Sequence, residues 1–88
     1  MDIHTYENGK MGNLLFQIDD KCYAELYPVF EKFQKATGQQ IDPYGDLVVD
    51  RYLGLLIAII ERQKQGHPVR SVLEQHAKTG GAIIFVGD

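Results

Sequence analysis

The chain has 88 residues, of which 44% are hydrophobic, and its formal net charge is −3. This length suits one modest core with little room for a deep substrate cavity, and the apolar content is too high for a disordered chain. The sequence has no basic stripe with interleaved aromatic residues, which disfavours direct binding of nucleic acid. We therefore expect a single domain over residues 1–88.

Residues 2–18 predict a β-hairpin. Two runs of strand-type residues flank Glu7-Asn8-Gly9-Lys10, and Asn-Gly supplies the positive φ angles that a type I′ turn needs. Because side chains alternate along a strand, we expect Leu14, Phe16 and Ile18 to face the core and Leu15 to point the other way.

The next segment predicts a helix that ends before Thr37-Gly38. Asp19 or Asp20 can serve as its N-cap, because a short carboxylate accepts hydrogen bonds from the free amides of a first helical turn. Pro28 would remove one hydrogen bond and clash with the preceding turn, so we expect a kink or a break there. The apolar stripe of this segment comprises Cys22, Leu26, Val29, Phe30 and Phe33.

Residues 47–60 are the most apolar segment and predict a helix that is buried on several sides or that offers an extra face to a partner chain. His67-Pro68 then opens a third helix, whose buried stripe includes His76. Residues 82–86 have the length of a strand. The predicted fold class is α+β, with an N-terminal β-hairpin, about three α-helices and a C-terminal strand completing a small antiparallel sheet.

The chain offers little catalytic chemistry. Cys22 is the only cysteine, which excludes an internal disulfide and leaves no second thiol for a zinc cluster. His76 fits a core or interface position better than a general base, and His67 fits a helix cap. We expect no catalytic residue, no metal site and no cofactor, and hence no enzyme.

Two segments of the sequence indicate where in the cell the protein is located. The amino terminus lacks the charged leader and apolar core of a signal peptide. The longest apolar stretch, residues 47–60, contains Asp50 and Arg51 and is too short to span a bilayer. We expect a cytoplasmic protein that does not contact a membrane.

Three aspartates, Asp42, Asp46 and Asp50, are spaced four residues apart, and no Lys or Arg lies between Gln39 and Asp50. If a helix began here, Asp42 or Asp46 would cap it, and the other acids would lie on one exposed face. That face has two interpretations: a merely solvated helix surface, or a contact for a cationic partner.

Acids and tyrosines are concentrated in the first half of the chain. Tyrosine gives binding area at a low cost in conformational entropy, and carboxylates pair with Lys and Arg of a basic protein. A nuclease is such a protein, since its cleft must attract phosphate. The sequence therefore predicts a partner-binding surface made of Asp19, Asp20, Tyr23, Tyr27, Asp42, Tyr44, Asp46 and Asp50.

The segment YPVFEKFQKATGQQIDPYGDL, with the closing GGAIIFVGD, resembles small immunity proteins of bacterial contact-dependent inhibition and related polymorphic toxin systems. The resemblance covers about half of the chain and implies a cytoplasmic, non-enzymatic protein that binds one toxin domain, often a nuclease, and neutralises it. It assigns no binding residues. The alternative is a structural or regulatory module that forms a homodimer through the apolar helix predicted at 47–60 or through an exposed edge strand at 82–86.

Overall fold

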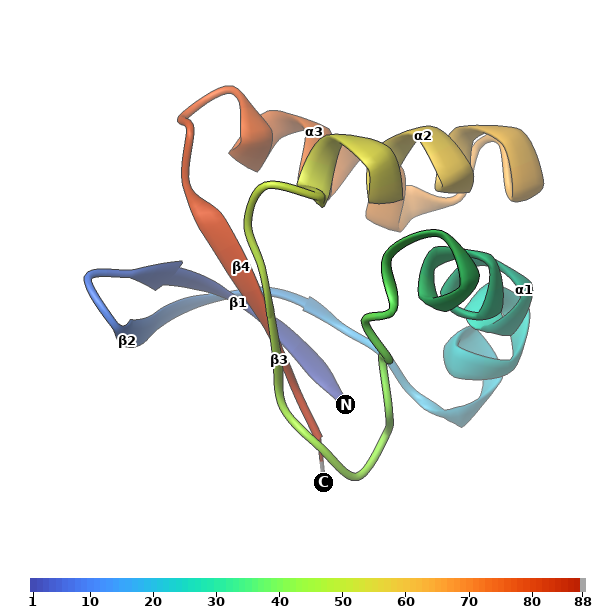
Figure 1. Ribbon diagram of the computed structural model, residues 1–88, viewed down its shortest axis with the longest axis horizontal. Helices are drawn as coiled ribbons and strands as arrows, with labels where there is room; N and C mark the ends of the chain where they lie inside the picture. The colour runs from blue at the N-terminus through green and yellow to red at the C-terminus, as the bar shows by residue number, and fades with distance from the viewer. Residues whose placement is uncertain (88) are drawn as a thin grey trace.

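The computed structural model describes residues 1–87 and contains one four-stranded antiparallel sheet with three helices packed against it (Figure 1). The strands lie in the order β2-β1-β4-β3, so β1 and β4 are central. The predicted α+β class, with its hairpin, three helices and C-terminal strand, is confirmed. In chain order the elements are β1 (Asp2–Glu7), β2 (Lys10–Gln17), α1 (Asp20–Thr37), β3 (Leu47–Val49), α2 (Leu53–Gln63), α3 (Pro68–Ala77) and β4 (Ala82–Val86).

The predicted hairpin is confirmed, and its turn has positive φ at both Asn8 (53°) and Gly9 (76°), as a type I′ turn requires. The expected facing of β2 is wrong in part. Ile3 pairs with Phe16, but the next residue of β1 pairs with Leu14, so β2 carries an extra residue at Leu15. This bulge resets the alternation, and Leu15 packs on the core while Leu14 is 48% exposed.

Helix α1 runs without a break through Pro28, so of the two expected outcomes the break does not occur. Pro28 and Ala24, whose carbonyl loses the amide bond, are both exposed, and water can therefore satisfy that carbonyl. Asp19 caps the helix as predicted, through a 2.8 Å bond from the Cys22 amide to its Oδ1. Gly38 ends it in the left-handed conformation, with φ of 79°.

The helix predicted over residues 47–60 is wrong at its start. Leu47–Val49 instead form β3, which pairs with Phe85, Ile84 and Ile83 of β4, and α2 begins only at Leu53. A run with two β-branched residues fits this edge strand well, and Val49 is fully buried there. Within the described chain Tyr52, not an aspartate, precedes α2, and it makes no side-chain capping bond.

The sheet has one face against the helices and one open face. Ile3, Ile83 and Phe85 point to the helices and are at most 1% exposed, and Phe85 meets the Phe30 ring of α1 edge-on at 5.9 Å. Strand β4 pairs on both sides, so the expected exposed edge at 82–86 is wrong. Among the described residues, no helix is long and apolar enough to cross a membrane.

Candidate functional site: an acid and tyrosine surface

The amino-terminal turns of α1 supply the first half of the candidate site. Asp19 holds the first turn as its cap, and Asp20 follows it as the first helical residue. Tyr23 and Tyr27 are one turn apart, so their rings lie on the same side of the helix, with centroids 6.1 Å apart in an edge-on arrangement. Carboxylates at this end of a helix also interact favourably with the helix dipole, which accounts for the stability of two adjacent acids there.

The loop between α1 and β3 supplies the second half. Asp42 Oδ1 accepts a 2.8 Å hydrogen bond from the Tyr44 amide, which is the geometry of an Asx turn. This turn projects the Tyr44 side chain outward, where it is 84% exposed. Asp46 Oδ1 accepts a 2.9 Å bond from the amide of Gly87, so the loop is tied to the end of β4.

These two segments meet around a surface hollow of about 310 Å³. Asp19, Asp20 and Tyr23 line it from α1, and Pro43 and Tyr44 line it from the loop. Burial, with smaller contributions from Tyr27 and Asp42, raises the pKa of the Tyr23 phenol. The Tyr27 ring packs against that of Tyr23, and Asp42 holds the amide of Tyr44. We call this set the acid–tyrosine surface: Asp19, Asp20, Tyr23, Tyr27, Asp42 and Tyr44.

Two of the eight predicted site residues lie outside this surface. Asp46 adjoins it, but its carboxylate holds Gly87 in place. Asp50 is exposed in the turn before α2, at the opposite end of β3 from Asp46. The three aspartates therefore do not share a helix face, and neither Asp42 nor Asp46 caps a helix, because the segment between them and Leu53 is a turn and a strand.

Among the described residues, the carboxylates of the acid–tyrosine surface have no lysine, arginine or histidine partner. Across residues 1–87, Asp19, Asp20 and Asp42 form no ion pair with Lys, Arg or His, whereas Glu25, Glu61 and Glu74 do. Acids that cluster without a counter-ion repel one another and raise the local negative potential. The surface can therefore attract and pair with cationic groups from outside the chain.

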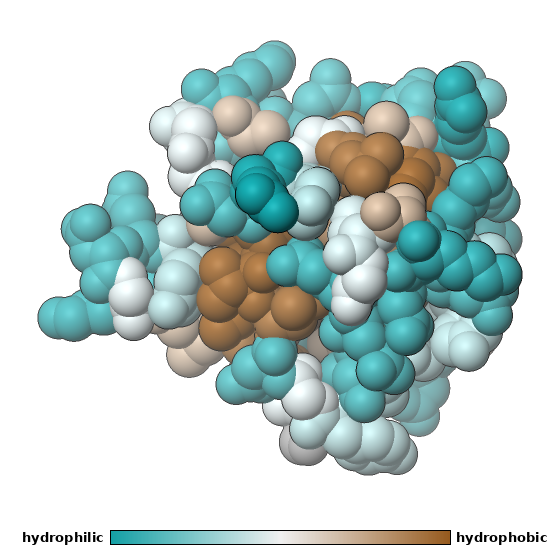
Figure 2. Space-filling view, in the orientation of Figure 1, coloured by the Kyte–Doolittle hydropathy of each residue, from teal (hydrophilic) through white to brown (hydrophobic). Residues whose placement is uncertain are grey.

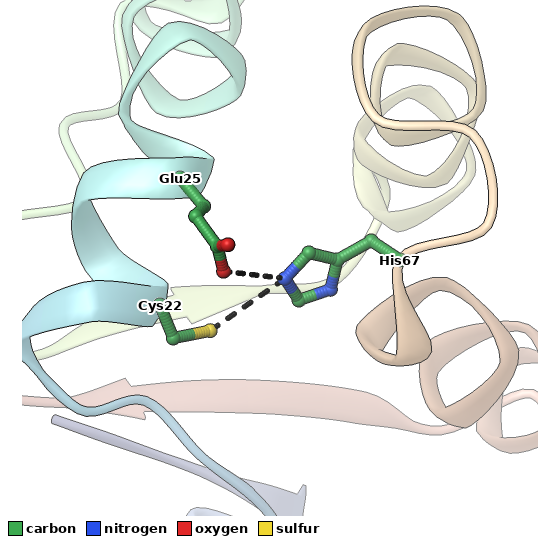
Figure 3. A group of neighbouring side chains, drawn as sticks. All are labelled: Cys22, Glu25 and His67. Carbon is green, nitrogen blue, oxygen red and sulfur yellow. Dashed lines mark hydrogen bonds and ion pairs between the residues drawn. The ribbon is translucent and has the colours of Figure 1, made fainter.

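A second cluster joins Cys22 and Glu25 of α1 to His67, the residue before α3 (Figure 3). His67 Nε2 lies 3.7 Å from Cys22 Sγ and 3.8 Å from Glu25 Oε1. The predicted capping role of His67 is confirmed, because its Nδ1 accepts a 3.1 Å bond from the Val69 amide. Sequence reasoning missed the cluster, since His67 is 45 residues from Cys22 and only the helical spacing of Cys22 and Glu25 was visible.

The Cys22 thiol is not activated as a nucleophile. Burial, followed by the nearby carboxylates of Asp19 and Glu25, raises its pKa above the ordinary value of 9.0. The thiol is therefore protonated at neutral pH. His76, the histidine of the predicted α3 stripe, is half-buried, and its Nε2 lies 2.9 Å from the carbonyl of Ala82, which is a satisfied structural position.

Two apolar areas are also exposed on the molecule. Both appear on the face shown in Figure 2, one over β3 and β4 and one over α2. The strand pairing lines up Val48, Ile84, His4 and Leu14 across the open face of the sheet. Leu55 of α2 is 39% exposed and lines a groove of about 300 Å³ between α1 and α2, together with Lys32 and Arg62.

Comparison with known proteins gives no relative: no family model matches the chain, and no curated protein or solved structure shows significant similarity to it.

Proposed function

We propose that this chain is a non-enzymatic, cytoplasmic immunity protein that binds a cognate toxin domain and blocks it, with a nuclease as the favoured class of toxin. The observation that carries the proposal is the convergence of six of the eight predicted residues on one surface. Asp19 and Asp20 at the start of α1 line the same hollow as Tyr44 of the loop. Neither these acids nor Asp42 pairs with Lys, Arg or His in the described chain.

The chemistry of this surface suits a basic active-site cleft. Grouped carboxylates present oxygens that can take the place of substrate phosphates on Lys and Arg. Their field speeds the encounter with a positive partner, so the association rate should fall as salt rises. Tyr44, at 84% exposure, supplies a large side chain that needs no rearrangement of the core to enter a partner's pocket.

The first test is an affinity pull-down of the tagged chain from lysate of its source organism, with mass spectrometry and a measured stoichiometry. The proposal expects one toxin domain at about one to one, and that domain is then used for binding kinetics. Recovery of the bait alone, as a discrete oligomer, would count against the proposal and in favour of self-association.

The second test uses variants that keep the local fold. Asp42→Asn retains an acceptor for the Tyr44 amide, and Asp20→Asn sits on an exposed first turn, so both remove charge with little structural effect. The matched control is Glu31→Gln, an exposed acid of the same helix about 16 Å from Asp20 at 1.5 Å per residue.

Binding to the recovered toxin domain should weaken roughly 10-fold or more for each acidic variant, mostly at low salt, and stay unchanged for the control. Tyr44→Ala should also weaken binding, because an exposed aromatic is removed from the contact. If the two acidic variants, Tyr44→Ala and the control all bound as tightly as the parent chain, with unchanged melting temperatures, the acid–tyrosine surface would not be the contact.

Self-association remains the second candidate, and the apolar groove beside Leu55 favours it. The helix concerned is α2, Leu53–Gln63, and the open face of the sheet adds further exposed apolar area. Sedimentation of the purified chain at high micromolar concentration decides the matter. A dimer that Leu55→Glu dissociates would support this function, and a monomer would exclude it.

A further inference from the structure

The cluster of Cys22, Glu25 and His67 brings one thiol, one carboxylate and one imidazole to a single point between α1 and the start of α3 (Figure 3). These three side-chain types are the ones that bind zinc in proteins. We propose that the cluster is a binding site for Zn²⁺, with Cys22 Sγ, Glu25 carboxylate and His67 Nε2 as its three protein ligands.

The distances fit this ion. The three ligand atoms lie within 4.8 Å of one another, with 3.7 Å between Sγ and Nε2 and 3.8 Å between Oε1 and Nε2. A tetrahedral zinc ion, with bonds of about 2.0–2.3 Å, holds its ligand atoms roughly 3.3–3.6 Å apart. Only a small closure is needed, and the Glu25 side chain, 49% exposed, is free to make it.

The backbone positions of the three ligands are set by helices α1 and α3. Cys22 and Glu25 are three residues apart on α1 and therefore share a helix face. His67 directly precedes α3, and its side chain is only 11% exposed. A hollow of about 380 Å³ opens beside the three ligands, so a water molecule can take the fourth position.

The charges around the site favour a cation. The Cys22 thiol faces the carboxylates of both Glu25 and Asp19, and Lys21 is the basic residue lining the same hollow. A divalent ion reverses the electrostatic penalty on the thiolate, since the metal displaces the thiol proton. Thiolate and Glu25 together then balance the two positive charges of the ion.

The cap of α3 is coupled to this binding. In the metal-free chain Nδ1 accepts from the Val69 N–H, so a neutral His67 ring carries its proton on Nε2. A metal on Nε2 moves that proton to Nδ1, where it would oppose the Val69 N–H. Zinc binding therefore breaks the cap, and the affinity should be roughly tenfold below that of the same ligands without a competing bond.

The experiment titrates the reduced 88-residue chain with Zn²⁺ by calorimetry in two buffers of different ionisation enthalpy, and with Co²⁺ by absorption. The site predicts one ion per chain, release of about one proton from Cys22 at neutral pH, and a thiolate-to-cobalt charge-transfer band. Nitrogen NMR of the ring should show the His67 proton moving from Nε2 to Nδ1.

Three variants test the ligands one at a time. Cys22→Ser removes the sulfur, Glu25→Gln removes a charge from an exposed side chain, and His67→Asn keeps a good helix cap while removing Nε2. Each should lower zinc affinity at least 10-fold. Glu31→Gln, on the same helix and outside the cluster, should bind like the parent chain.

Two results would overturn the site. One is the absence of saturable zinc binding to the parent chain. The other is equal affinity of the parent, Glu25→Gln and His67→Asn chains, which would mean that the thiol alone captures the ion. Glu25→Gln keeps this test decisive even if another variant loses its fold.

Discussion

The cap of α1 gives the sharpest prediction, because Asp19 has both a structural and a proposed binding role. Its Oδ1 accepts a 2.8 Å bond from the Cys22 amide, and this bond is exposed to water. Asp19→Ala should therefore lower the free energy of unfolding by about 1 kcal/mol, within the 0.5–2 kcal/mol that cap deletions cost. For a domain of this size, that corresponds to a fall of roughly 4–8 °C in the melting temperature.

Asp19→Asn separates the two roles. Asparagine caps helices about as well as aspartate, so the cap bond stays. The lost interaction with the helix dipole, about 0.3–1 kcal/mol, is offset by relief of repulsion from Asp20 and other nearby acids. Stability should therefore change by less than about 0.5 kcal/mol, while binding to a cationic partner weakens.

Urea unfolding followed by circular dichroism, with Glu31→Gln as the control, measures these differences. Unchanged stability of the Asp19→Ala chain would refute the capping argument. A loss in Asp19→Asn as large as in Asp19→Ala would mean that the charge, and not the hydrogen bond, stabilises α1.

Further predictions concern the core, a helix end and the alkaline limit of stability. Phe33 is fully buried, so Phe33→Ala should cost about 3–5 kcal/mol in urea unfolding, a large share of the roughly 5–15 kcal/mol by which ordinary domains are stable. Gly38 has φ of 79° with open space around it, so Gly38→Ala should cost about 1 kcal/mol from backbone strain alone, whereas a neutral result would contradict the left-handed cap. The pKa values of the Cys22 thiol and the Tyr23 phenol are raised above 9.0 and 10.0 by burial first and by nearby groups second. The folded chain thus holds these protons more tightly than the unfolded chain. Their contribution to the free energy of unfolding is complete below about pH 9 and is lost as pH rises through the pKa values of the folded state. A series of melting temperatures from about pH 8 to 11 can follow this loss.

Local signals in the sequence determined much of the framework. Asn8-Gly9 specifies its turn because few residues accept two consecutive positive φ angles, and Asp19, His67-Pro68 and Gly38 specify helix ends through bonds to the nearest few amides and carbonyls. These features involve neighbours within a few residues. They can therefore be predicted without knowledge of the rest of the fold.

The candidate site was predictable only as a composition. The sequence gathers acids and tyrosines into residues 19–50, but it does not show which of them meet. Asp42 and Tyr44 join the start of α1 because the loop is tied at Asp46 to Gly87, a contact that spans 41 residues. Asp50 falls outside because it lies beyond β3.

The tertiary structure alone decided the facts that depend on distant partners. Leu47–Val49 has the spacing of a helix and becomes a strand because β4 offers it unpaired backbone groups and a buried position for Val49. Leu15 turns inward because of a bulge that is defined only by the register with β1. The approach of Cys22 to His67 needs α1 and α3 to be packed against the same sheet. Short-range hydrogen bonds and backbone preferences depend on adjacent residues, so the sequence determines them. Strand register, burial and contacts between distant side chains exist only once the chain has folded.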